Sequence, residues 1–127
     1  MNTREVIEKF HEYASTGNWN GWLSLFDDNA ILDESIHGHM KGKERLRLAA
    51  DALKNYYSEF KNTPMEIVVE GNRGVSVWHI EGITASGYPV DAKGVNVYKV
   101  ENGRIIHMEN YLDPAPFKPF DDQFKEE

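Results

Sequence analysis

Apolar positions in the first half of the chain recur every three or four residues, as they do on one face of a helix. Asn2, followed three residues later by Glu5, forms the pattern of a capping box at the start of the first such segment. The apolar positions behind it are Val6, Ile7, Phe10, Tyr13 and Ala14. We therefore predict a helix over residues 3–15, which Gly17 ends.

The same spacing predicts two further helices. Asn18 can cap a second helix, whose apolar side is formed by Trp19, Trp22, Leu23, Leu25 and Phe26. A third helix is predicted to begin near Lys43 and to run through Phe60, and Pro64 forbids its continuation. Between these two helices we expect a short strand over residues 30–33 and a loop over residues 34–42.

From Met65 onward apolar residues alternate with polar ones, which is the period of a strand. The predicted strands cover residues 65–70, 75–84, 88–100 and 104–112. Asn102-Gly103 separates the last two strands and is a strong hairpin signal, because a type I′ turn needs positive φ at both central residues. Sequential strands of this length form a meander that twists and curls. We predict an α+β domain whose curled antiparallel sheet wraps around the N-terminal helices.

The composition narrows the class of protein. The chain has 127 residues, no cysteine and a net charge of −7. The length allows one domain with a real core, and the lack of cysteine excludes a disulfide framework and a thiolate nucleophile. The negative charge, without a cluster of Lys and Arg, argues against a nucleic-acid partner. No apolar run resembles a membrane span or a secretory signal, so we expect a cytoplasmic protein with no membrane partner.

The last predicted hairpin places two amides on one face. By strand parity Asn96 and Asn110 share that face with Tyr98, Met108 and Leu112. Buried amides cost roughly 1–3 kcal/mol each if they are left unpaired. These two amides therefore either bond each other or orient a ligand.

The strand over residues 75–84 leaves open which of its faces lines a pocket. His79 and Glu81 point one way, whereas Trp78 and Ile80 point the other. A shift of one residue in register exchanges the two faces completely. His79 is a candidate acid or base if it faces inward, and Trp78 is the pocket wall if it does not.

Two histidines in the predicted loop, His37 and His39, have the residue types of a metal site together with Glu34 and His79. No further ligand stands at a defined spacing from them, so we predict no metal. We expect the loop to close over the mouth of a pocket instead.

Three segments of the chain resemble the nuclear transport factor 2-like superfamily: Leu25-Phe26-Asp27-Asp28-Asn29-Ala30-Ile31, Gly42-Lys43-Glu44-Arg45-Leu46, and residues 97–105. Within that superfamily the chain is most similar to the SnoaL-like polyketide cyclases and the ketosteroid isomerases. The resemblance implies a cone-shaped, cystatin-like α+β barrel with a pocket between the helices and the concave sheet. It also implies a homodimer through the outer face of the sheet. The domain is assigned to residues 1–113, and the acidic tail over residues 114–127, which carries Pro and Phe, is expected to lie over a surface.

The resemblance also implies roles for single residues. The general base of the isomerases corresponds to Glu34, and Asp33 is the competing carboxylate. The acid on the third long strand of the isomerases corresponds to Asn96, and the catalytic aspartate of the cyclases corresponds to Asn110. Neither amide can supply a proton, so the chain departs from both family patterns.

The resulting hypothesis is a cofactor-free enzyme that moves a proton within a mostly apolar, oxygenated small molecule, by isomerisation, cyclisation or dehydration. Glu34 takes the proton, Asn96 and Asn110 hold the developing oxyanion, and His79 or Tyr98 returns the proton. The expected pocket lining consists of Phe10, Trp22, Phe26, Tyr57, Trp78, Tyr98, Met108 and Leu112. The alternative is a non-catalytic ligand-binding or dimerisation domain of the same fold, which the two amides favour.

Overall fold

The structure, a computed structural model, describes residues 1–117 and contains three helices in its N-terminal half. Helix α1 spans Thr3–Thr16, α2 spans Trp19–Ser24 and α3 spans Lys43–Tyr56. The predicted capping box is present, because the Asn2 side chain accepts from the Glu5 backbone while the Glu5 side chain accepts from Asn2. Gly17 ends α1 with φ of 73°, which a residue without Cβ adopts readily. No helix among the described residues is long and apolar enough to cross a membrane.

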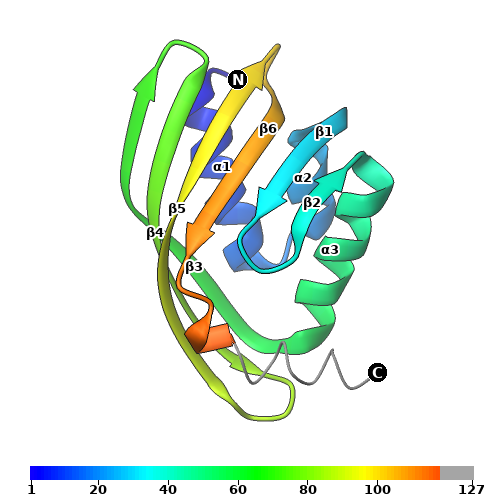
Figure 1. The fold of residues 1–127 in the computed structure, drawn as a ribbon, viewed down its shortest axis with the longest axis vertical. Coiled ribbons are helices and arrows are strands. Elements are labelled where there is room, and N and C mark those ends of the chain that lie inside the picture. Colours follow the sequence, from blue (N-terminus) through cyan, green and yellow to red (C-terminus); the bar gives the residue numbers. More distant parts are fainter. Residues whose placement is uncertain (118–127) are drawn as a thin grey trace.

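Six strands form one curled sheet in the order β2-β1-β6-β5-β4-β3 (Figure 1). Their bounds are Phe26–Glu34 (β1), Gly38–Lys41 (β2), Tyr57–Glu70 (β3), Arg73–Thr84 (β4), Pro89–Glu101 (β5) and Arg104–Leu112 (β6). The last four strands form the predicted antiparallel meander, and β1 then pairs in parallel with β6. The α+β class and the curled sheet that we predicted are therefore confirmed.

Three expectations about the first half of the chain are wrong. Helix α2 ends at Ser24, so Leu25 and Phe26, expected on its apolar side, lie outside it, and β1 begins at Phe26. Residues 34–42 are not a loop throughout, because β2 pairs antiparallel with β1 from Gly38 to Lys41. The third helix ends at Tyr56, and Tyr57 is already extended with φ of −109° and ψ of 130°. The apolar residues that seemed to continue the helix belong to β3, which pairs with β4 from Tyr57 to Glu70. Strand pairing has overridden the local helical spacing.

The sheet has a helix-facing side and an outer side, and the core lies on the first. In Figure 1 the curled sheet bends around α1, which packs on β3 and lies behind the long strands. The main core cluster joins apolar side chains of α1, α2 and α3 to the helix-facing positions of β1, β5 and β6. A second cluster lies farther along the same side of β4 and β5, and consists of Trp78, Ile80, Val90, Ala92 and Phe117. The site described below lies on the helix-facing side, with the main cluster and the second cluster around it.

The start of the predicted tail packs on this second cluster. Ala115–Phe117 forms a short 3-10 helix, η1, and the Phe117 side chain is 7% exposed against Trp78 and Ile80. Residues 115–117 of the predicted tail therefore lie against the helix-facing side of the sheet. Phe120 and Phe124, also assigned to the tail, lie outside the described residues.

Candidate functional site

A row of polar residues crosses the helix-facing side of the sheet. Glu34 on β1 is the register partner of Asn110 on β6, and Asn110 is the partner of Asn96 on β5. Asn96 is in turn the partner of Ser76 on β4. We call these four residues the polar row. Because register partners project from the same side of a sheet, the three residues predicted to act together lie on neighbouring strands and on one side.

Three members of the polar row, Asn110, Asn96 and Ser76, are connected by a chain of hydrogen bonds that passes through Tyr98. The Trp78 indole Nε1 donates to Asn96 Oδ1 at 2.9 Å, and Asn110 Nδ2 donates to the same oxygen at 3.0 Å. Asn96 Nδ2 donates to the Tyr98 hydroxyl at 3.0 Å. Asn96 is 2% exposed, so its amide serves the protein interior and does not face a ligand directly. Of the alternatives left open by the sequence, mutual bonding of the two amides is what the structure shows.

The chain continues from Tyr98 to helix α1. The Tyr98 hydroxyl lies 2.8 Å from Ser76 Oγ, and Ser76 Oγ lies 2.9 Å from His11 Nε2. His11 Nδ1 lies 3.0 Å from Asn62 Oδ1, which can only accept. His11 therefore carries its proton on Nδ1 and accepts at Nε2, as a neutral imidazole. Burial supports this state, because desolvation lowers the pKa of His11 to about 4.

Ser76, His11 and Asn62 are connected like a nucleophile, its base and an orienting amide. Ser76 is completely buried and its oxygen is also bonded to the Tyr98 hydroxyl. A substrate cannot reach this serine, so the three residues satisfy polar groups within the core. Tyr98 is likewise completely buried, and burial raises the pKa of its hydroxyl. The suggested return of a proton by Tyr98 does not fit that environment.

Glu34 has a partner that the sequence analysis did not assign to it. The Glu34 carboxylate lies 2.7 Å from His37 Nδ1, and the Glu34 side chain is 23% exposed. Across the helix-facing side, burial and then the negative charge of Glu34 raise the pKa of Tyr57 to about 12. The carboxylate and the imidazole together form a pair that can exchange a proton close to the surface.

Asn110 presents a polar atom without a partner. Its Oδ1 is buried and has no hydrogen-bond donor among residues 1–117. An acceptor buried without a partner costs about 1–3 kcal/mol. This cost makes the oxygen of Asn110 the best candidate for a contact with a ligand in the part of the chain described.

The structure resolves the open question about β4. Trp78 points to the helix-facing side and is 1% exposed. His79 points to the outer side, where Nε2 lies 2.8 Å from Asp91 and Nδ1 lies 3.7 Å from Glu81. The hypothesis that His79 shares a pocket with Glu34 is therefore wrong in this geometry, because alternate residues of a strand face opposite sides.

The residues expected to line the pocket divide into two groups. Five of them are at most 5% exposed in the main core cluster and pack against one another: Phe10, Trp22, Phe26, Tyr98 and Met108. Tyr57, Trp78 and Leu112 instead belong to the second cluster or pack against it, near the polar row. The second group is the one that a ligand beside Asn110 and Glu34 would contact.

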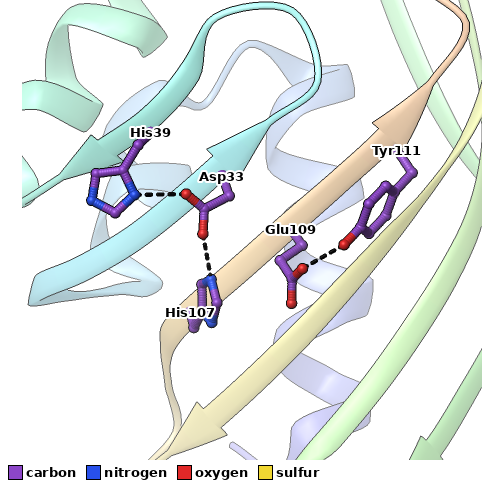
Figure 2. Close-up of polar contacts among 5 residues, drawn as sticks. All are labelled: Asp33, His39, His107, Glu109 and Tyr111. Atoms are coloured by element: carbon purple, nitrogen blue, oxygen red, sulfur yellow. Dashed lines mark hydrogen bonds and ion pairs between the residues drawn. The ribbon is translucent and has the colours of Figure 1, made fainter.

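Figure 2 shows a separate group of polar residues on the outer side of the sheet. Asp33 lies between two histidines, with Oδ1 at 2.7 Å from His39 Nδ1 and Oδ2 at 2.8 Å from His107 Nε2. The hydrogen bond from His107, followed by that from His39, holds the pKa of Asp33 below its ordinary range. Alongside, Tyr111 donates to Glu109 at 2.5 Å. Asp33, the competing carboxylate, thus faces away from the polar row.

The four residues weighed as a metal site do not converge, because His37 pairs with Glu34, His39 pairs with Asp33 and His79 lies on β4. The possible ligand atoms of His79, Glu81 and Asp91 do lie within 4.8 Å of one another on the outer side. Both carboxylates are exposed, and His79 is already paired with them. This arrangement is a hydrogen-bonded surface group of one histidine and two carboxylates.

The comparisons with known proteins agree with this fold. A family model described as SnoaL-like domain matches residues 7–108. A curated relative, the uncharacterized protein YesE of Bacillus subtilis (strain 168), is 23% identical over 122 residues, which cover 90% of this chain and 83% of the relative.

Solved structures show the same architecture. An NTF2-like protein of unknown function from Cytophaga hutchinsonii has a TM-score of 0.73 at 24% identity and covers 93% of this chain and 96% of its own. An LEH-like epoxide hydrolase from M. tuberculosis has a TM-score of 0.78 at 15% identity, with 91% of this chain and 85% of its own covered. At these identities the likeness concerns the fold. The matching family model covers most of the chain, which therefore belongs to the SnoaL-like domain family.

Proposed function

We propose that this protein is a small-molecule enzyme of the SnoaL-like type that transfers a proton within a mostly apolar, oxygenated substrate without a cofactor. The observation that carries the proposal is the polar row, in which Glu34 and Asn110 are register partners on neighbouring strands and project from the same side of the sheet. The apolar residues of the second cluster border the same region. A site of this composition binds the carbon skeleton by apolar contact and orients it by a few polar groups.

In the proposed mechanism Glu34 removes a proton from a carbon next to a carbonyl group. The electron pair of the broken C–H bond forms a new C=C bond. In a dehydration it expels a hydroxyl group from the next carbon, which leaves as water after taking up a proton from the Glu34 and His37 pair. In an isomerisation the same pair returns the proton to another carbon. His37 replaces His79 and Tyr98 in this role, because it alone of the three contacts Glu34 among the described bonds.

The experiment uses two probes that report directly by ultraviolet absorbance. One is the aldol adduct of benzaldehyde and acetone, which absorbs more strongly after dehydration. The other is a β,γ-unsaturated cyclohexenone, which becomes conjugated after isomerisation. We expect Glu34→Gln to reduce turnover of the active probe by about 100-fold or more. The matched control is Glu66→Gln, since Glu66 is an exposed carboxylate on the outer side of β3. Turnover that is the same in both variants, or absent from the wild type, would contradict the proposal.

A non-catalytic binding domain is the second candidate, and a specific observation favours it. Asn96 and Asn110 stand where the related enzymes carry acids, and their amides bond each other. If this candidate is correct, the probes bind the wild-type protein and no product forms with either one.

We also propose that the protein works as a cytoplasmic homodimer joined through the outer side of the sheet. Four valines form a square there, since Val75 is paired with Val97 and Val77 with Val95. All four are only partly buried, and the neighbouring side chains Val68 and Tyr111 are 55% and 54% exposed. Burial of this apolar patch against a second copy would remove it from water.

A further inference from the structure

We propose that Asn110 Oδ1, held in place by Trp78 through Asn96, accepts a hydrogen bond from a hydroxyl group of an apolar ligand. This inference rests on the proposed ligand site and names the chemical class that the site selects. It differs from the oxyanion role expected from the sequence, in which the amide would donate to the ligand.

Trp78 fixes the orientation of the Asn96 amide. An indole N–H can only donate, so the atom of Asn96 that lies 2.9 Å from Trp78 Nε1 must be the amide oxygen. The amide nitrogen of Asn96 then faces the Tyr98 hydroxyl at 3.0 Å and donates to it. If the Asn96 amide were rotated by half a turn, its NH2 group would face the indole N–H of Trp78, and two donors would oppose each other.

The Asn96 oxygen in turn fixes Asn110. The atom of Asn110 that lies 3.0 Å from Asn96 Oδ1 must be the nitrogen, since two carbonyl oxygens at that distance repel each other. The oxygen of Asn110 therefore points away from Asn96. It is buried and finds no donor among residues 1–117.

The rest of the chain supports the same direction. Tyr98 receives a hydrogen from Asn96, so its own hydrogen goes onward, to Ser76 Oγ at 2.8 Å or to His11 Nε2 at 3.3 Å. His11 accepts because its proton is on Nδ1, facing Asn62. Reversing Asn110 alone would set its oxygen against Asn96 Oδ1, and reversing Asn96 as well would break its bonds with Trp78 and Tyr98.

A hydroxyl group is the ligand feature that complements this oxygen. Glu34, the register partner of Asn110 on β1, adds further acceptors on the same side. A carbonyl oxygen placed against Asn110 Oδ1 would face another acceptor, whereas a hydroxyl group placed there would donate to it. Asn110 is partly exposed as a residue, while its Oδ1 atom is buried. Trp78 and Leu112 supply apolar contact for the carbon skeleton.

The test compares α-tetralol with α-tetralone, which share a carbon skeleton and differ in a hydroxyl against a carbonyl. Binding is followed by NMR on protein labelled with 15N, through the side-chain amide signals of Asn110 and the dissociation constants. We expect α-tetralol to bind about tenfold or more tightly than α-tetralone, because a site that pairs a hydroxyl rejects the analogue without it. Equal binding of the two probes, or binding of neither, would overturn the inference.

Three variants separate the effect of the Asn110 amide orientation from the effect of apolar packing in the second cluster. Asn110→Leu removes the acceptor and should abolish the preference. Trp78→Phe removes the indole N–H, so the amides of Asn96 and Asn110 are free to turn. The preference for α-tetralol should then decrease, because α-tetralone gains affinity. The matched control is Ile80→Val, a smaller side chain in the same cluster, which should keep the preference. A preference retained in both Asn110→Leu and Trp78→Phe would also contradict the inference.

The outcome is independent of the proposed reaction. The preference for α-tetralol is a binding measurement on the wild type and on Asn110→Leu, whereas the proposed reaction is tested by turnover in Glu34→Gln. A preference without turnover of any probe would leave the inference standing and refute the enzyme. Turnover that depends on Glu34, together with equal binding of α-tetralol and α-tetralone, would support the enzyme and refute the inference about Asn110.

Discussion

Gly94 on β5 leaves the space that the Trp78 ring occupies. A Cβ at this position would lie 2.3 Å from Trp78 Cζ2 and 2.8 Å from the Tyr111 carbonyl oxygen. We expect Gly94→Ala to destabilise the protein by about 2–3 kcal/mol, because the indole is fully packed and cannot shift freely. Chemical denaturation measures this change.

The same substitution is a test of where the clash arises. In a Trp78→Phe background the outer ring of the indole is absent, so adding Gly94→Ala should cost less than it does in the wild type. Equal costs in the two backgrounds would show that the Tyr111 backbone, rather than Trp78, limits the space.

His11 makes the stability of the fold sensitive to acid. Burial lowers its pKa to about 4 from 6.5, so below pH 6.5 the unfolded chain binds a proton that the folded chain does not. The free energy of unfolding therefore has its full value above pH 6.5 and decreases as the pH falls from 6.5 toward 4. We expect about 2 kcal/mol to be lost between pH 7 and pH 5 through this residue. Denaturation of His11→Gln at the same pH values should show a smaller loss, and a loss equal to that of the wild type would show that His11 is not its source.

Strand parity was enough to predict part of the candidate site. It placed Asn96 and Asn110 on one face, and the family resemblance pointed to Glu34. Neither strand parity nor the resemblance identified His37 as the partner of Glu34, because that contact depends on the turn between β1 and β2. The bonds of His11 to Asn62 and Ser76 were missed for a related reason. They join positions 51 and 65 residues apart, so only the assembled fold brings them together.

At the scale of elements, helix α1 depends on its cap. The Asn2 side chain accepts from the Glu5 backbone at 2.9 Å, and removing it leaves an N–H group of the first turn without that partner. We expect Asn2→Ala to lower the free energy of unfolding by about 1 kcal/mol. Asn20→Ala is the matched control, because Asn20 is exposed within α2. A change of equal size in both variants would show that the cap does not stabilise α1.

The element boundaries that were predicted correctly are those set by local chemistry. The cap at Asn2, Gly17 and the Asn102-Gly103 turn, where both residues have positive φ, act within a few residues. The boundary between α3 and β3 is different, because Tyr57 to Phe60 carry both a helical spacing and a partner strand. Pro64 is tolerated in β3 because β3 is an edge strand with an irregular register next to it.

At the scale of the molecule, the square of valines on the outer side of the sheet predicts the oligomeric state. We expect the wild type to be a dimer and Val97→Glu to be a monomer, because a charge at the centre of the interface would be buried without a partner. Light scattering coupled to size-exclusion chromatography measures the mass. Leu48→Glu is the control, since Leu48 is 61% exposed on α3. A monomeric wild type would refute the dimer.

The pairing of β1 with β6 joins strands that lie far apart along the chain. When β1 and β2 leave the ribosome, the strand that will hold them to the rest of the sheet has not yet been translated. Until its nine residues are available, the early hairpin has an open edge and Glu34 has no Asn110 beside it. Contacts of such long range slow folding, so completion of the sheet and completion of the site are one late event.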